Sequence, residues 1–219
     1  MAGTTVNDDN NVAACVKEAM AEFGHEITID DVKDVMGYPK PDAITVLLGK
    51  HGIADSELVD KIHEVFVNKM INFYSTHPQI KEKSGASETF RRLKASGVGV
   101  GLDTGFSRNI TNAIIDRMGW MEHNLIDVSV SSDEVAHGRP HPDMIYKAMD
   151  LLNISSASEV VKVGDTISDL QEGHSAGCKY VIGITTGTNT REELAAAYNT
   201  HLIDHISSVA DIVLADSEA

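Results

Sequence analysis

Asp165 and Asp169 lie four residues apart directly after a short apolar run, and this spacing is the clearest chemical signal in the sequence. The run at 160–163 has strand character, a Gly-Asp turn follows it, and a helical pattern starts at Ser168. In open α/β sheets, ligands bind at the carboxyl edge of the strands, where this turn would lie. Two carboxylates placed in this way can hold a hard cation such as Mg²⁺ beside a phosphate-bearing ligand. The structural alternative is a turn in which Ser168 caps the helix and the helix dipole favours Asp169.

Two other predicted strands also end in polar residues, Asp103-Thr104 after 98–103 and 131–133 after 125–131. Arg139 stands between them and the aspartate pair, just before a helix that begins with prolines. A hydroxyl, a guanidinium and carboxylates at one sheet edge suit a phosphoryl group, whose transfer depends on positioning and charge neutralisation. Taken alone, Arg139 is more simply a surface-loop residue. The combination in this order favours a phosphoryl site.

Strands and helices alternate in the second part of the chain. The expected strands are 98–103, 125–131, 160–163, 180–184 and 211–214, and the expected helices are 87–95, 107–118, 142–152, 168–176 and 191–198. This alternation predicts an α/β fold, a Rossmann-like parallel sheet with helices on both faces. Residues from about 10 to about 80 show only helical periodicity, with helices expected at 10–24, 28–35, 42–51 and 56–77.

The composition excludes several classes of protein. Among the 219 residues, 42% are hydrophobic and 23% charged, as in globular proteins. A net charge of -15 disfavours binding to nucleic acid, and the longest apolar runs are too short to cross a membrane, so we expect a cytoplasmic protein. Cys15 and Cys178 are far apart and predict neither a disulfide nor a metal site, and the scattered histidines do not indicate zinc.

These motifs resemble those of the haloacid dehalogenase superfamily, and in particular its phosphonoacetaldehyde hydrolase (phosphonatase)-like branch. The matching segments are Leu102-Asp103-Thr104-Gly105-Phe106, Gly138-Arg139-Pro140 and Gly164-Asp165-Thr166-Ile167-Ser168-Asp169. The resemblance implies that Thr104, Gly105 and Arg139 bind the phosphoryl group, that Asp165 binds Mg²⁺ and that Asp169 supports the metal site. It also implies a core formed by 1–7 and 83–219 and a small helical cap formed by 8–82.

The first motif of that branch is Asp, any residue, Ala, Gly, Thr, Thr, and Met1-Ala2-Gly3-Thr4-Thr5 supplies all of it except the aspartate. In the family this aspartate attacks phosphorus, and its position would be immediately before Met1. Ala2 stands where phosphatases keep a second aspartate, so only its backbone carbonyl can serve the metal. In the family the central strand of the sheet leads into this motif. We therefore expect the first core strand, some ten residues with the nucleophile, to be missing here; the alternative is a non-catalytic protein with a reorganised sheet.

Lys40 lies in Met36-Gly37-Tyr38-Pro39-Lys40, which resembles the cap segment that carries the Schiff-base lysine of phosphonatases. Such a lysine must be desolvated or lie near another cation to be neutral at pH 7. True phosphonatases carry a histidine three residues later, where this chain has Ala43. Lys40 could instead contact an anionic substrate or be a surface lysine.

Three functions follow as expectations. The first is a Mg²⁺-dependent, phosphonatase-like hydrolase that acts on a small phosphonate or phosphorylated metabolite through an aspartyl-phosphate intermediate. The second is a phosphatase of a small phosphate monoester, and the third is a phosphate-binding protein without turnover. The resemblance also implies a possible homodimer formed through cap helices.

Overall fold

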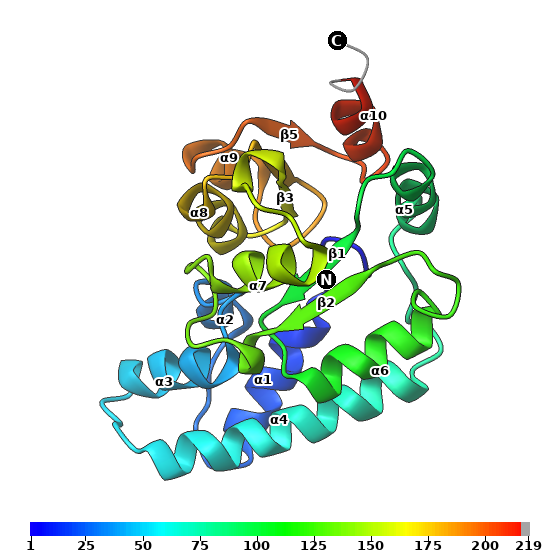
Figure 1. Cartoon of the computed structure of the whole chain (residues 1–219). Coiled ribbons are helices and arrows are strands. Elements are labelled where there is room, and N and C mark those ends of the chain that lie inside the picture. The colour runs from blue at the N-terminus through cyan, green and yellow to red at the C-terminus, as the bar shows by residue number, and fades with distance from the viewer. Residues whose placement is uncertain (216–219) are drawn as a thin grey trace.

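The computed structural model describes residues 1–215, and it contains two parallel sheets surrounded by helices (Figure 1). One sheet pairs β1 with β2, and the other has the order β3-β4-β5. The strands are β1 (Gly101–Thr104), β2 (Val128–Ser131), β3 (Val161–Gly164), β4 (Tyr180–Ile184) and β5 (His201–Ile203). All three pairings are parallel, so the predicted α/β class with a parallel sheet is confirmed.

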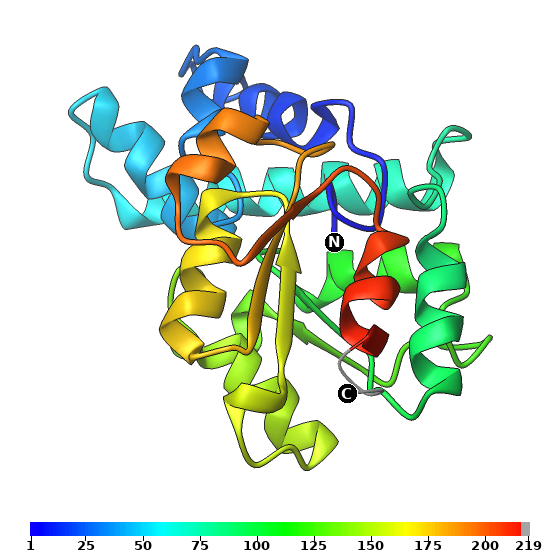
Figure 2. The same ribbon diagram turned by 90° about the horizontal axis from the view of Figure 1, so that it is seen from above.

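Helices connect the strands and cover both faces, as right-handed crossovers require. They are α5 (Ala86–Ala95), α6 (Arg108–Met118), α7 (Asp143–Leu152), α8 (Ile167–Ala176), α9 (Arg191–Ala196) and α10 (Ser208–Ala215), with single 3-10 turns at Ser132–Glu134 and Ala157–Glu159. Figure 2 shows α10 beside α5. The two helices are joined by an ion pair of 2.8 Å between Arg92 and Asp211.

The N-terminal part is helical, as its periodicity predicts. Its helices are α1 (Asn11–Ala21), α2 (Ile29–Lys33), α3 (Lys40–Lys50) and α4 (Ser56–Thr76). Helix α4 buries one residue per turn along a single stripe, for example Ile62, Phe66 and Met70. That stripe packs between α1 and α6, so the helical layer rests directly on the α/β layer (Figure 1).

Two backbone segments connect the helical layer to the rest. Lys83 N–H donates to the Thr5 carbonyl at 2.8 Å, and Asn7 N–H donates to the Lys81 carbonyl at 3.0 Å. The segment that leaves the α/β layer, at Thr5 to Asn7, therefore lies beside the segment that returns to it, at Lys81 to Lys83. The division into a core of 1–7 and 83–219 and a cap of 8–82 stays a prediction.

One predicted element is wrong, and one strand was not predicted. The segment 211–214 belongs to helix α10 instead of a strand, and residues 216–219 lie outside the described part of the chain. A short apolar run is too short for its periodicity to tell a helix from a strand. In the structure Val209 and Val213, four residues apart, line one groove, as residues on one face of a helix do. The last strand is instead the three-residue β5, whose polar start gave no strand signal.

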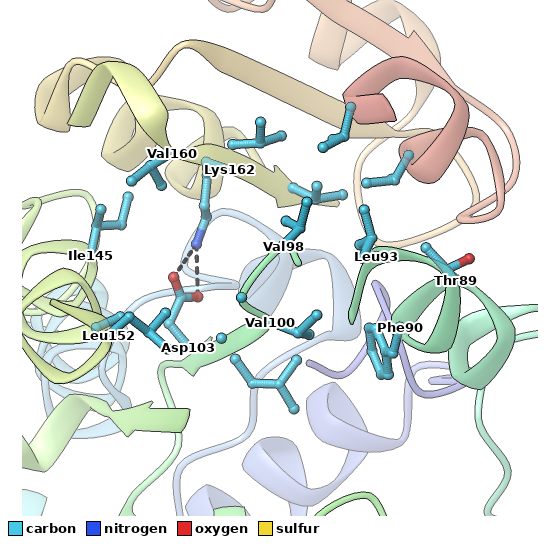
Figure 3. A pocket seen from close by; sticks show the side chains of 18 of the residues that line it. Thr89, Phe90, Leu93, Val98, Val100, Asp103, Ile145, Leu152, Val160 and Lys162 are labelled. Atoms are coloured by element: carbon cyan, nitrogen blue, oxygen red, sulfur yellow. Dashed lines mark hydrogen bonds and ion pairs between the residues drawn. The ribbon is translucent and has the colours of Figure 1, made fainter. Parts of the chain in front are cut away.

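A groove separates the two sheets. Among residues 1–215, no strand pairs with the second edge of β1 or of β3. The edges flank a groove of about 420 Å³, which α5 and α10 line on one side and α7 on the other (Figure 3). A missing first strand would belong between such edges, and its absence from this sequence stays a prediction.

Within the described part of the chain, no helix combines the length and apolar character needed to span a membrane. Cys15 and Cys178 are free and half-buried, as expected for cysteines outside a disulfide.

Candidate active site

A small pocket at the carboxyl ends of β1 and β3 collects the residues singled out by the sequence. Its volume is about 30 Å³, and Met1 also borders the larger groove. The predicted site residues in its lining are Ala2, Lys40, Thr104, Gly105, Arg139, Asp165 and Asp169. Parallel strands place their carboxyl ends at one edge of the sheet, which brings together side chains up to 167 positions apart (169 − 2).

Asp165 is held rigidly at the turn after β3. Thr4 Oγ donates to one carboxylate oxygen at 2.6 Å, and the Thr188 N–H donates to the other at 2.9 Å. A Cβ on Gly3 would collide with this carboxylate, and Gly3 has φ +81°, which favours glycine. The Gly-Thr turn near the N-terminus therefore fits against Asp165.

Asp169 has three structural partners, Thr166, Arg139 and Lys162. Thr166, and not Ser168, is the N-cap of α8, and the Asp169 carboxylate completes the capping box by accepting from Thr166 N–H at 3.1 Å. Its other oxygen forms an ion pair with Arg139. Burial alone would raise the pKa of Asp169, but Arg139 and Lys162 outweigh burial and hold that pKa well below its usual range.

Arg139 is buried within a charged cluster. Burial alone would lower its pKa, but the surrounding carboxylates, Asp169 first, raise it, so the guanidinium stays charged. Its Nε has no hydrogen-bond partner among the described residues and lies 4.0 Å from Glu172. This buried N–H of Arg139 is therefore a donor without a hydrogen bond among the described residues. Thr104 also lines the pocket, and its hydroxyl oxygen accepts from Phe106 N–H at 3.2 Å.

Lys162 is a functional candidate that the sequence reasoning missed. Its ammonium donates to Asp103 at 2.7 and 2.5 Å and to Glu172 at 2.5 Å, and it lies 3.4 Å from Asp169. Burial of Glu172, followed by the charge of Asp103, raises the pKa of Glu172 to about 8. A lysine in an otherwise apolar strand run was the signal that could have indicated a buried ion pair.

Two places offer carboxylates to a metal ion. Asp103, Asp169 and Glu172 bring ligand atoms within 4.8 Å of one another, but Lys162 already contacts all three. The second place is the pocket itself, where Asp165 and Asp169 offer carboxylate oxygens and Ala2 a backbone carbonyl. Hard oxygen donors of this kind suit Mg²⁺. Asp169 already pairs with Arg139 and Lys162, whereas no basic side chain among residues 1–215 is paired with Asp165, so Asp165 is the better candidate ligand for Mg²⁺.

Lys40 is the first residue of α3, and it is buried with only 4% of its surface exposed. Its ammonium donates to the Tyr38 carbonyl at 3.3 Å and lies 5.7 Å from the centre of the Phe106 ring. Burial first, and then the charge of Arg139, lowers the pKa of Lys40 to about 8. With this pKa, about one tenth of the amine is neutral at pH 7, far more than for an exposed lysine.

The loop 36–39 brings Lys40 to the pocket through three close backbone approaches. A Cβ on Gly105 would lie 2.5 Å from the Tyr38 carbonyl oxygen, one on Gly138 would collide with Pro39, and one on Gly37 would collide with Ser168. Gly37 has φ +88°, a conformation that other residues adopt only with strain. Gly37 in the loop, and Gly105 and Gly138 opposite it, thus allow the loop 36–39 to pack directly against the pocket.

Comparison with known proteins agrees with this arrangement. A Rossmann-like parallel sheet beneath a helical layer, with carboxylates, a guanidinium and a hydroxyl in one pocket, suits a hydrolase that acts on a phosphoryl group. Residues 1–183 match the family described as haloacid dehalogenase-like hydrolase, and the chain belongs to that family.

Individual relatives point to one branch. The chain is 30% identical over 225 residues to a phosphonoacetaldehyde hydrolase of Bacillus cereus, covering 95% of this chain and 83% of the relative. A phosphonoacetaldehyde hydrolase-like protein from Oleispira antarctica has the same fold, with a TM-score of 0.81 and 21% identity over 99% of this chain and 90% of that one. A predicted phosphoglycolate phosphatase from Haemophilus somnus also shares the fold, with a TM-score of 0.79 and 19% identity over 97% and 94% of the two chains. The resemblance seen in the sequence is confirmed.

Proposed function

We propose that the protein is a Mg²⁺-dependent phosphonatase-like hydrolase that acts on a small phosphonate carrying an aldehyde. The observation that carries this proposal is Lys40, a buried amine with a pKa of about 8 in the same pocket as Thr104, Arg139 and Asp165. A neutral amine beside a phosphoryl site can condense with an aldehyde with loss of water, and the imine, once protonated, accepts the electron pair of the breaking carbon-phosphorus bond. The relatives named phosphonoacetaldehyde hydrolase support this substrate class.

In this proposal, the polar groups of the pocket divide the work of binding and charge neutralisation. Thr104 and Gly105 position one side of the phosphoryl group, and Arg139 neutralises its charge. Asp165, the Ala2 carbonyl and Asp169 would hold Mg²⁺, which supplies further charge neutralisation when bound. The resemblance assigns the role of phosphoryl acceptor to the aspartate of the family's first motif, whose other residues correspond to Met1-Ala2-Gly3-Thr4-Thr5. The loop 36–39 excludes water while the group is transferred.

A second candidate is a phosphatase of a small phosphate monoester, and Ala43 favours it. Ala43 is buried about one helical turn beyond Lys40, so it supplies no side chain that could move a proton near the imine. In this candidate Lys40 stays protonated and binds an anionic group of the substrate. The lysine would then serve specificity and form no covalent bond.

Turnover of phosphonoacetaldehyde against a panel of phosphate monoesters, by the chain extended with the aspartate of the first motif, separates the two candidates. In the first, Lys40→Arg abolishes phosphonoacetaldehyde cleavage, because arginine keeps the charge but cannot form the imine. In the second, Lys40→Arg changes KM for monoesters and leaves kcat within a small factor. Lys50→Arg, on the exposed end of the same helix, is the control. Magnesium-dependent binding of phosphate without turnover of any substrate would contradict both and support a non-hydrolytic binding protein.

A further inference from the structure

Lys83 connects two segments of the chain that lie far apart in the sequence. Its backbone N–H donates to the carbonyl of Thr5, in the turn 2–6, at 2.8 Å. Its ammonium donates to the carbonyl of Thr186, and also to the hydroxyl of Thr186 at 3.2 Å. Thr186 belongs to the loop 185–190, which follows β4. A single residue therefore joins the turn to the loop.

Asp165 lies between the turn and the loop and is held by both. Thr4 Oγ of the turn donates to one carboxylate oxygen at 2.6 Å, and Thr188 N–H of the loop donates to the other at 2.9 Å. Asn189 N–H also donates to the backbone carbonyl of Asp165 at 3.1 Å. The loop passes so close that a Cβ on Gly187 would lie 2.2 Å from the Asp165 Cβ. The position of this carboxylate therefore depends on how the turn and the loop are held together.

The ammonium of Lys83 also interacts with the charge of Asp165. Burial lowers the pKa of Lys83, while the negative charges of Asp165, Asp8 and Asp9 act in the opposite direction. A positive charge near Asp165 repels any other cation, so the charge of Lys83 by itself would weaken the binding of Mg²⁺. Hydrogen bonds that orient the surroundings of a metal ligand have the opposite effect, because they hold the ligand ready to bind. The two roles therefore predict opposite changes in metal affinity when the lysine is replaced.

We propose that Lys83 is a positioning residue for the metal site, which holds the loop 185–190 against the turn 2–6 and so fixes the carboxylate of Asp165 from both sides. This role rests on the proposed Mg²⁺ site at Asp165. Lys83 lies where the chain returns from the helical layer, so the same residue links that layer to the site. The contact with Thr186 is exposed, so its loss should loosen the loop without unfolding the protein.

Hydrogen exchange of the metal-free protein, followed by mass spectrometry, tests whether Lys83 holds the loop. Lys83→Met removes the ammonium and keeps an unbranched side chain of similar length. We expect the amides of the loop 185–190 to exchange roughly tenfold faster in this variant, since hydrogen bonds from a charged donor are lost. Lys83→Arg keeps charged donors and should restore slow exchange. Lys81→Met, whose side chain is exposed in the same returning segment, should leave the loop unchanged.

Isothermal titration with Mg²⁺ tests the consequence for the metal site. We expect Lys83→Met to bind Mg²⁺ about ten to one hundred times more weakly than the unmodified chain, as is usual when a group that orients a metal ligand is removed. Lys83→Arg and Lys81→Met should bind Mg²⁺ like the unmodified chain. Circular dichroism and the exchange of α4 amides report whether each variant is folded.

Equal or tighter Mg²⁺ binding by folded Lys83→Met would overturn the proposal, because Lys83 would then act only through its charge or not at all. Unchanged exchange of the loop 185–190 in Lys83→Met would overturn it as well. A different result identifies a failure of the proposed function: the unmodified chain would then bind no Mg²⁺, and the positioning role would be wrong together with the metal site.

Discussion

Lys162 on β3 donates to both carboxylate oxygens of Asp103 on β1, at 2.7 and 2.5 Å, and so joins two sheets that share no backbone ladder. Burial alone would raise the pKa of Asp103, but Lys162 and Arg139 outweigh burial and lower it. This side-chain ion pair therefore connects β1 and β3, which no backbone hydrogen bonds join among the described residues.

Asp103→Asn should therefore destabilise the fold. Removing one partner of a buried ion pair leaves the other charge poorly compensated, and we expect the free energy of unfolding to fall by about 3 kcal/mol. Urea unfolding monitored by circular dichroism measures this change. Glu57→Gln removes the exposed pair with Lys61 on α4 and should give no measurable change. Equal midpoints for both variants would show that the Lys162 contact contributes nothing.

Gly37→Ala should disturb the contact between the helical layer and the pocket. The added Cβ meets Ser168 and also forces alanine into a left-handed backbone conformation. Gly24 has nearly the same φ, +81°, but no atom lies within 4 Å of the place that a Cβ would take there. Gly24→Ala should cost about 1 kcal/mol from backbone strain alone, and Gly37→Ala should cost clearly more.

Hydrogen exchange separates the two effects of Gly37→Ala. Faster exchange in the loop 36–39 and at the start of α8 is expected for this variant, while Gly24→Ala should leave both regions unchanged. If the two variants lose the same free energy and exchange alike, the loop does not depend on its close approach to Ser168.

Lys40 should react with an aldehyde at a rate that depends on pH with a midpoint near 8. Below its pKa the amine is protonated and cannot attack a carbonyl, so the rate should rise about tenfold per pH unit up to about pH 8 and then level off. Reductive trapping with phosphonoacetaldehyde and borohydride, quantified by peptide mass spectrometry, measures this profile. Lys61 is the internal control, because its hydrogen bond to Glu57 raises its pKa and its rate should still rise above pH 9. Identical profiles for the two lysines would argue against a reactive Lys40.

Magnesium should bind at Asp165 and stabilise the folded protein. A ligand that binds only the native state raises the free energy of unfolding by about 2.7 kcal/mol at one hundred times its dissociation constant. Thermal unfolding with and without Mg²⁺ should show this increase in the unmodified chain and lose it in Asp165→Asn. Asp60→Asn, on the exposed face of α4, should keep it. If Mg²⁺ still stabilises Asp165→Asn against thermal unfolding, the metal binds at another group of carboxylates.

Much of the local structure could be predicted from the sequence because it depends on near neighbours. The stripe of apolar residues in α4 and the Asp-Thr turn after β3 are determined by periodicity and turn chemistry within about four residues. The motifs around Thr104, Arg139 and Asp165 likewise pointed to one sheet edge, since parallel strands end together. These residues do line one pocket.

Only the tertiary structure could decide what depends on distant groups. The segment 211–214 became helical because it packs against α5, and short apolar runs carry no periodicity that distinguishes this outcome. The lowered pKa of Lys40 arises from burial and from Arg139, which is 99 positions away (139 − 40). The pairing of Lys162 with Asp103 and the groove beside it depend on how two sheets face each other. The sequence by itself determined most of the elements and the chemical groups of the pocket, whereas burial, charge pairing and the free strand edges arose from contacts between distant parts of the chain.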